Sequence, residues 1–194
     1  VVPVDRDEGG GYALPLAPWS IVDKPEHSWR GLMLDTSRRY YTVPRIMSFI
    51  DAMAQHKLNV LHWHVTDAVS LPLVSTTFPN LTLGAFSNDA IYTPTEVEDL
   101  LAYAKDRGVR VVLELDMPGH NWAYSVAFPQ LFANCSGQKG LPIQTEFWQD
   151  AVGPTQPALY EMIEQLLTEM AGRFPDSVMH LGGDEVDPQC WANN

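Results

Sequence analysis

Val178-Met179-His180-Leu181-Gly182-Gly183-Asp184-Glu185 lies close to the C-terminal end of this 194-residue chain. An apolar run bounded by glycines is typical of a buried strand, and this one leads into two adjacent carboxylic acids. Neighbouring side chains on a regular strand point to opposite faces, so Asp184 and Glu185 share one site only if the strand bends. Gly182 and Gly183 give the backbone the freedom for that bend. An Asp-Glu pair is equally typical of a solvated loop or a helix start, so the pair alone does not decide.

Three earlier segments repeat the pattern of an apolar run that ends in an aspartate. We expect strands at residues 31–35, 59–67 and 109–116, which end at Asp35, Asp67 and Asp116. Helical periodicity separates these segments. The expected helices begin after Thr42, at the capping-box sequence Thr93-Pro94-Thr95-Glu96 and at about Pro157; the second ends at Gly108 and the third near Pro175.

Strict alternation of strands and helices predicts an α/β fold with a parallel sheet. Four strands that each end in an acid, with long loops after the second and third, favour the rim of a (β/α)8 TIM barrel. Four β/α units are half of such a barrel, which takes about 250 residues when complete. We therefore expect an incomplete barrel in a chain that looks truncated, with an entry segment or domain tail at residues 1–28 and the barrel half at 29–194.

Composition excludes some partners. Acidic residues number 24 against 12 basic ones, so nucleic acid and anionic membrane surfaces are not expected partners. No apolar run approaches the roughly 18 residues of a membrane span. Two glycosylation triplets begin at Asn80 and Asn134 and point mildly to a secretory route. The two cysteines, Cys135 and Cys190, are by default free thiols.

Four ordered motifs carry a family resemblance. They are Trp29-Arg30-Gly31-Leu32-Met33-Leu34-Asp35-Thr36-Ser37-Arg38, Leu61-His62-Trp63-His64-Val65-Thr66-Asp67, Met117-Pro118-Gly119-His120 and His180-Leu181-Gly182-Gly183-Asp184-Glu185-Val186. The sequence closely resembles the eukaryotic, lysosomal or secreted β-N-acetylhexosaminidases of glycoside hydrolase family 20. The resemblance implies a TIM-barrel enzyme that removes terminal β-linked N-acetylglucosamine or N-acetylgalactosamine with retention, without metal or cofactor. A dimer is implied for the full-length enzyme.

The resemblance also implies roles for individual residues. Glu185 is the expected general acid and base, and Asp184 orients the substrate's own 2-acetamido group, which serves as nucleophile. An ionised Asp184 would favour a protonated Glu185, because two adjacent carboxylates ionise together only at a cost. Arg30 is expected to bind sugar hydroxyls, and Asp67 and His120 to line the pocket near the acid.

The same resemblance changes the expectation for the cysteines. Cys135 and Cys190 match a pair that is bridged in the eukaryotic enzymes. We therefore expect a disulfide that ties the loop after the third strand to the end of the fourth. Closing a loop of about 55 residues contributes about 4 kcal/mol in the chain-entropy model.

A metal site is the main chemical alternative within the motifs. His62 and His64 lie two residues apart and share a face, which is typical of metal-dependent hydrolases. No third ligand at suitable spacing is evident in the sequence, and the resemblance explains the motif without a metal, so no metal is expected. Glu114 and Asp116 are interpreted as strand-end polar contacts, and Trp63 as a core residue.

Departures from the family pattern limit the expected activity. Ala68 follows Asp67 where the family commonly has a second acidic or polar residue. The later strands, which complete the sugar pocket, have no counterpart, so we expect the isolated chain to be inactive. A non-catalytic sugar- or partner-binding remnant is the alternative function, and a metal hydrolase is a third.

Overall fold

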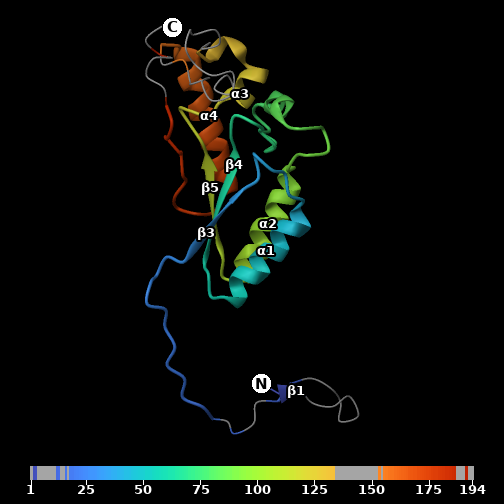
Figure 1. Ribbon diagram of the computed structural model, residues 1–194, viewed down its shortest axis with the longest axis vertical. Coiled ribbons are helices and arrows are strands. Elements are labelled where there is room, and N and C mark those ends of the chain that lie inside the picture. Colours follow the sequence, from blue (N-terminus) through green and yellow to red (C-terminus); the bar gives the residue numbers. More distant parts are fainter. Residues whose placement is uncertain are drawn as a thin grey trace.

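The computed structural model describes residues 2–3, 12–13, 16, 18–133, 153, 155–186 and 191. Near the N-terminus, β1 (Val2–Pro3) and β2 (Tyr12–Ala13) pair in antiparallel fashion. Residues 18–28 are exposed and lead into the main sheet, and Figure 1 shows this segment extending away from the rest of the chain. The described part of the expected entry segment thus contributes little to the folded body.

The body is built on a three-stranded parallel sheet. Its strands are β3 (Gly31–Asp35), β4 (Val60–Thr66) and β5 (Arg110–Leu115), in the spatial order β3-β4-β5. The predicted strands therefore form within a residue or two of the expected bounds, and the predicted parallel α/β architecture is confirmed. Between His64, level with Glu114, and Thr66, level with Leu115, β4 carries one extra residue.

The fourth predicted strand differs from the expectation. Residues 178–185 form a single parallel bridge, between His180 and Glu114, rather than a regular strand. The backbone still runs alongside β5: Leu115 and Met117 donate their N–H groups to the carbonyls of His180 and Leu181. The pairing stops at the glycine pair, because Gly182 and Gly183 both adopt positive φ angles, +66° and +109°.

Three longer helices follow the predicted pattern. They are α1 (Val43–Gln55), α2 (Pro94–Asp106) and α4 (Pro157–Arg173). The capping box of α2 forms as expected: Glu96 donates its N–H to the Thr93 hydroxyl, and Thr93 donates its N–H to the Glu96 carboxylate. In Figure 1, α1 and α2 lie side by side along one side of the sheet.

The long loops contain short helices that the sequence did not predict. The connection after β4 includes the 3-10 helix η2 (Pro79–Gly84), and the connection after β5 includes α3 (Trp122–Ala127) and the 3-10 helix η3 (Pro129–Leu131). The two loops pack tightly, because a Cβ atom at Gly84 would overlap the backbone of Ala123.

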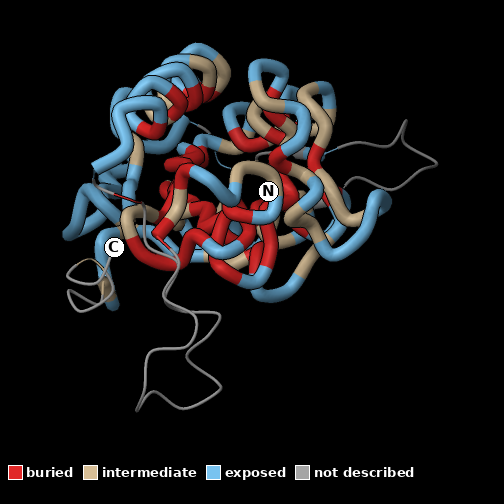
Figure 2. The backbone as a smooth tube through the Cα atoms, turned by 90° about the horizontal axis from the view of Figure 1, so that it is seen from above, coloured by how far each residue is buried: buried red, intermediate tan, exposed pale blue. Residues whose placement is uncertain are grey.

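The two faces of the sheet have opposite chemistry. Alternate residues such as Leu61, Trp63 and Leu113 join the apolar core under the helices. Trp63 is fully buried there and donates its indole N–H to the Thr36 hydroxyl at 2.8 Å, which confirms its interpretation as a core residue. The residues between them, among them His64 and Glu114, give the other face buried polar groups. Figure 2 shows the buried residues gathered at the centre of the folded body, with exposed residues along the outer sides of the helices.

Candidate active site

The Asp184-Glu185 pair lies where the backbone bends, as the glycines predicted. Gly182, Gly183 and Glu185 all have positive φ angles, and an added Cβ on Gly182 would overlap the carboxylate of Asp116. Both acidic side chains face solvent, Asp184 with 71% and Glu185 with 58% of its side-chain surface exposed. The described residues thus hold the pair at one sheet edge and leave both carboxylates open to water.

Asp116 holds the bend in place. Its buried carboxylate accepts the N–H of Gly183 at 3.1 Å, and its own backbone is fixed by the Thr66 hydroxyl and the Asn121 amide. Burial raises the pKa of Asp116, and the Gly183 N–H opposes this shift. Asp116 is therefore a polar contact at the strand end, as the sequence suggested. Because it holds Gly183, it also positions the acidic pair.

His120 connects the acidic pair to the interior of the sheet. Its ring is buried, with Nε2 3.3 Å from Oε2 of Glu185 and 4.0 Å from Oδ2 of Asp184. On the other side, Nδ1 lies 3.9 Å from Oδ1 of Asp67. The structure therefore places His120 between Asp67 and Glu185, with one ring nitrogen towards each carboxylate.

Asp67 is buried among cations. Its Oδ2 atom lies 2.7 Å from Nη2 of Arg38 and 3.1 Å from Nε2 of His64. Burial alone would raise the pKa of Asp67, but these two partners lower it. Asp67 is therefore ionised at neutral pH, and it presents a fixed negative charge to His120.

The arginine at this site is Arg38, whereas the sequence predicted Arg30. Arg30 precedes β3 and lies at the opposite end of the sheet, where its guanidinium donates to the carbonyls of Lys57 and His27 at 2.6 and 2.7 Å. Arg30 therefore does not lie beside the acidic pair, because residues before a parallel strand lie at the end away from the strand-end carboxylates.

Arg38 reaches the site through a turn at the end of β3. The carboxylate of Asp35 accepts the N–H groups of Ser37 and Arg38, at 3.0 and 2.9 Å, and binds the Arg38 guanidinium at 2.8 Å. Such a turn is a common use of aspartate. In the sequence, the position of Asp35 three residues before Arg38 was the signal that could have identified this arginine.

A second polar cluster lies deeper on the same face. The Glu114 carboxylate contacts His62, lies 3.0 Å from Nδ1 of His64 and lies 3.2 Å from Nδ1 of His180. Burial would raise the pKa of Glu114, but His64 and the other histidines lower it to about 2. Burial would likewise lower the pKa of His64, whereas Asp67 and Glu114 raise it to about 10. His64 is thus a fixed cation that joins the cluster to the rim.

The structure describes only part of the remaining predicted sites. Asn80 is exposed within η2. Asn134, Cys135 and Cys190 lie outside the described residues, so the second triplet and the disulfide stay predictions. Among the described residues, none of the helices combines the length and the apolar character that a membrane crossing requires.

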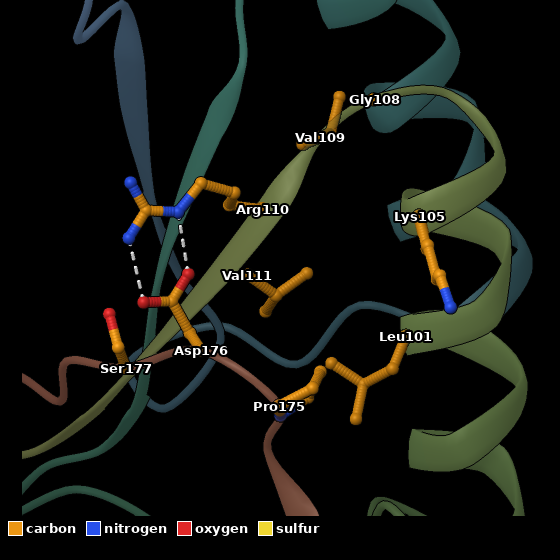
Figure 3. Close-up of a pocket in the computed structure, with 9 residues that line it drawn as sticks. All are labelled: Leu101, Lys105, Gly108, Val109, Arg110, Val111, Pro175, Asp176 and Ser177. Atoms are coloured by element: carbon orange, nitrogen blue, oxygen red, sulfur yellow. Dashed lines mark hydrogen bonds and ion pairs between the residues drawn. The ribbon is translucent and has the colours of Figure 1, made fainter.

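A separate groove lies at the amino end of β5, away from the acidic pair. It has a volume of about 630 Å³ and lies between the end of α2 and the segment after α4. Figure 3 shows the guanidinium of Arg110 facing the carboxylate of Asp176 across one side, with hydrogen bonds of 2.7 and 2.8 Å. Because this ion pair satisfies both charges, the groove offers no reactive group comparable to the acidic pair.

Comparison with known proteins identifies the family to which the chain is similar. Residues 27–194 match the model of the glycosyl hydrolase family 20 catalytic domain. The chain is 43% identical over 176 residues to the β-hexosaminidase subunit beta of Mus musculus, covering 90% of this chain and 32% of that protein. It is 40% identical over 190 residues to β-hexosaminidase subunit B2 of Dictyostelium discoideum, covering 94% of this chain and 33% of that protein.

Solved structures give the same relationship. A family 20 exo-β-N-acetylglucosaminidase from Vibrio harveyi, solved with N-acetylglucosamine, superposes with a TM-score of 0.78 at 29% identity, over 89% of this chain and 30% of that chain. A chitobiase from Flavobacterium johnsoniae superposes with a TM-score of 0.77 at 31% identity, over 88% of this chain and 26% of that chain. The chain spans about a third of the length of the curated relatives that it matches.

Proposed function

Because this chain belongs to glycosyl hydrolase family 20, we propose that its strand-end site acts on glycans that end in a β-linked N-acetylhexosamine. The reaction is the removal of that terminal sugar with retention, in which the substrate's 2-acetamido oxygen bonds to the anomeric carbon. The observation that carries the proposal is the set of contacts from buried Asp67 through His120 to Glu185, whose carboxyl group is exposed.

In this proposal Glu185 moves the proton. It donates a proton to the glycosidic oxygen while the bond between that oxygen and the anomeric carbon breaks. The ionised Glu185 then takes a proton from water, whose oxygen opens the cyclic intermediate and releases the sugar. General acid and base help of this kind typically contributes about 10²–10⁴-fold in rate.

Asp184 and Arg38 have the binding roles. Asp184 accepts the acetamido N–H and stabilises the positive charge that develops on the cyclic intermediate. Arg38 is an exposed cation of the rim, with 43% of its side-chain surface in solvent, and it donates to sugar hydroxyls in place of Arg30. His120 and Asp67 orient Glu185 from the buried side.

Sugar binding without turnover is the second candidate function. The exposure of both carboxylates favours it, because the described residues leave the acidic pair open to water. We expect the isolated chain to release no measurable chromophore from a chromogenic N-acetylglucosaminide. Robust release that Glu185→Gln abolishes would reject the expected inactivity and would establish the catalytic role directly.

Calorimetric titration separates acetamido recognition from non-specific sugar binding. The chain should bind N-acetylglucosamine saturably and glucose not at all, since glucose lacks the acetamido group that Asp184 is proposed to hold. Asp184→Asn should weaken this binding, while Asp89→Asn, at an exposed position in the loop before α2, should leave it unchanged. Equal heats for the two sugars would count against the proposed function.

The secretory features form part of the same proposal. A lysosomal or secreted location, glycans on Asn80 and Asn134, a Cys135–Cys190 disulfide and a dimer of the full-length enzyme accord with the family. Intact-mass measurement after alkylation tests the disulfide. No alkylated thiol should form without reductant and two should form with it, whereas two alkylated thiols without reductant would refute the bridge.

A further inference from the structure

Two consecutive backbone N–H groups at the bend before the acidic pair are each held by a side chain. Gly182 donates its N–H to Nδ1 of His180 at 3.0 Å, and Gly183 donates its N–H to Oδ1 of Asp116 at 3.1 Å. Because the glycine backbone is conformationally free, contacts such as these are needed to select one bend. Asp116 acts from β5, whereas His180 acts from the same segment as the acidic pair.

His180 ends the sheet pairing of this segment. Its N–H donates to the carbonyl of Leu113 at 2.9 Å, and its carbonyl accepts the N–H of Leu115 at 3.1 Å. In a regular parallel ladder the N–H of Gly182 would come next and would donate to the carbonyl of Leu115. It donates instead to the imidazole of His180, so the chain leaves the sheet at Gly182 with this N–H satisfied. Aspartate and asparagine form turns of the same kind when their side chains accept the N–H two residues later.

The polar cluster on the sheet supports the His180 ring. The ring centroid lies 4.6 Å from that of the His62 ring, at an interplanar angle of 35°. On β5, Oε1 of Glu114 lies 3.2 Å from Nδ1 of His180. The side chain of Glu114 is buried and that of His180 is half exposed, so the imidazole lies on a buried support. Because both its backbone and its ring contact the sheet, His180 fixes the bend relative to β5.

Nδ1 of His180 has two neighbours and can bond only one of them at a time. Its lone pair accepts the N–H of Gly182, whereas a bond to the Glu114 carboxylate needs a proton on the same nitrogen. The Glu114 carboxylate also contacts His62 and His64. When Nδ1 bonds to Gly182, Glu114 therefore keeps two histidine partners, and this arrangement satisfies both groups.

We propose that His180 is a positioning residue for the acidic pair. It holds Gly182 while Asp116 holds Gly183, and the two contacts together set the direction in which the pair leaves the sheet. The inference rests on the proposed function, in which Asp184 accepts the acetamido N–H of the sugar. His180 acts on that recognition through the backbone and not by contact with the sugar.

Two substitutions at position 180 separate the acceptor from the bulk of the ring. His180→Asn keeps a side-chain acceptor that reaches the N–H two residues later, and His180→Leu keeps bulk without an acceptor. His27→Leu, which changes an exposed histidine before the sheet, is the matched control. In calorimetric titrations with N-acetylglucosamine, His180→Leu should bind about two- to tenfold more weakly than the parent chain, as expected for the loss of one neutral hydrogen bond. His180→Asn and His27→Leu should bind like the parent.

NMR spectroscopy of the ¹⁵N-labelled chain tests the bend without any sugar. A scalar coupling between the amide nitrogen of Gly182 and Nδ1 of His180 should be present in the parent, because the N–H···N bond transmits it. In His180→Leu the amide protons of both Gly182 and Gly183 should exchange with solvent faster, although Asp116, the acceptor for Gly183, is unchanged. His180→Asn should restore slow exchange at both glycines. A bond that acts only locally would alter Gly182 alone.

The outcomes separate this inference from the proposed function. Absence of the coupling would overturn the role of His180, and so would faster exchange confined to Gly182. Equal, saturable sugar binding by the parent and His180→Leu would overturn it as well. If the parent binds no N-acetylglucosamine, the proposed function fails, and the coupling together with the exchange of Gly183 still decides whether His180 sets the bend.

Discussion

Gly182 lies directly against the carboxylate of Asp116, so that a Cβ atom at position 182 would overlap it. The glycine also has a φ of +66°, which L side chains rarely adopt. This close approach allows the neighbouring Gly183 N–H to reach Asp116 and turns Asp184 and Glu185 out of the sheet.

Gly182→Ala should therefore destabilise the chain. We expect the free energy of unfolding, measured with urea, to fall by about 1–3 kcal/mol, because the alanine is strained and displaces Asp116. Gly172→Ala is the matched control. Gly172 lies in α4 with nothing near its Cβ position, so alanine there should be neutral or stabilising by about 0.5–1 kcal/mol. Equal losses for both variants would contradict the close approach.

Arg38 should matter for sugar binding, and Arg30 should not. Arg38→Ala removes the exposed cation beside Asp35 and Asp67, so the affinity for N-acetylglucosamine should fall by about tenfold or more. Arg30→Ala changes a guanidinium at the other end of the sheet and should leave the affinity unchanged. Calorimetry on both variants checks the assignment, which fails if Arg30→Ala is the variant that weakens binding.

Glu169 should make stability depend on pH in the acid range. Burial acts to raise its pKa, but hydrogen bonds from Ser75, Thr76 and Thr77 lower it to about 2 from 4.5. Because its folded pKa is depressed, Glu169 contributes stability that is fully present above about pH 4.5 and is lost as the pH falls towards 2.

The measurement is the difference in unfolding free energy between the parent chain and Glu169→Gln at several pH values. The difference should be largest above about pH 4.5 and should shrink as the pH falls. Glu164→Gln, at an exposed position on the same helix, should show no such trend. A constant difference for Glu169→Gln across this range would show that its charge is not what stabilises the loop.

The capping box of α2 gives a local prediction. Thr93→Ala should lower the unfolding free energy by about 1 kcal/mol, because it leaves the Glu96 N–H without its side-chain acceptor. Thr95→Ala, two residues later and exposed, keeps both box residues and should change stability by less than half as much. Chemical denaturation of both variants decides whether the box contributes as its geometry indicates.

Local signals explain which parts of the fold could be predicted. Thr93 and Glu96 are three residues apart and fix the start of α2, and Gly108 fixes its end without reference to the rest of the chain. The bend at Gly182 and Gly183 could likewise be predicted from the two adjacent glycines. The fourth strand was only partly predictable, since the same glycines that gave the bend also end its regular pairing.

Contacts between distant residues explain what could not be predicted. The contact between His62 and Glu114 spans 52 positions along the chain, and no local period reveals it. Arg38, by contrast, could be identified from the sequence, because Arg30 precedes the predicted strand at residues 31–35 and Arg38 follows it. The meeting of His120 with Asp67 and Glu185 was expected from the family resemblance, while its distances required the structure.

The extra residue in β4 determines which way Asp67 faces. Side chains alternate along a strand, so a strict count from His62 and His64 would turn position 67 towards the helices. One additional residue between His64 and Thr66 reverses this alternation. Asp67 instead faces the same side as His64, with which its carboxylate forms a hydrogen bond. Removing a single residue from this stretch would point a buried carboxylate into an apolar core. The position of the Asp67 carboxylate at the rim thus depends on one extra residue in β4, which reverses the alternation of side chains.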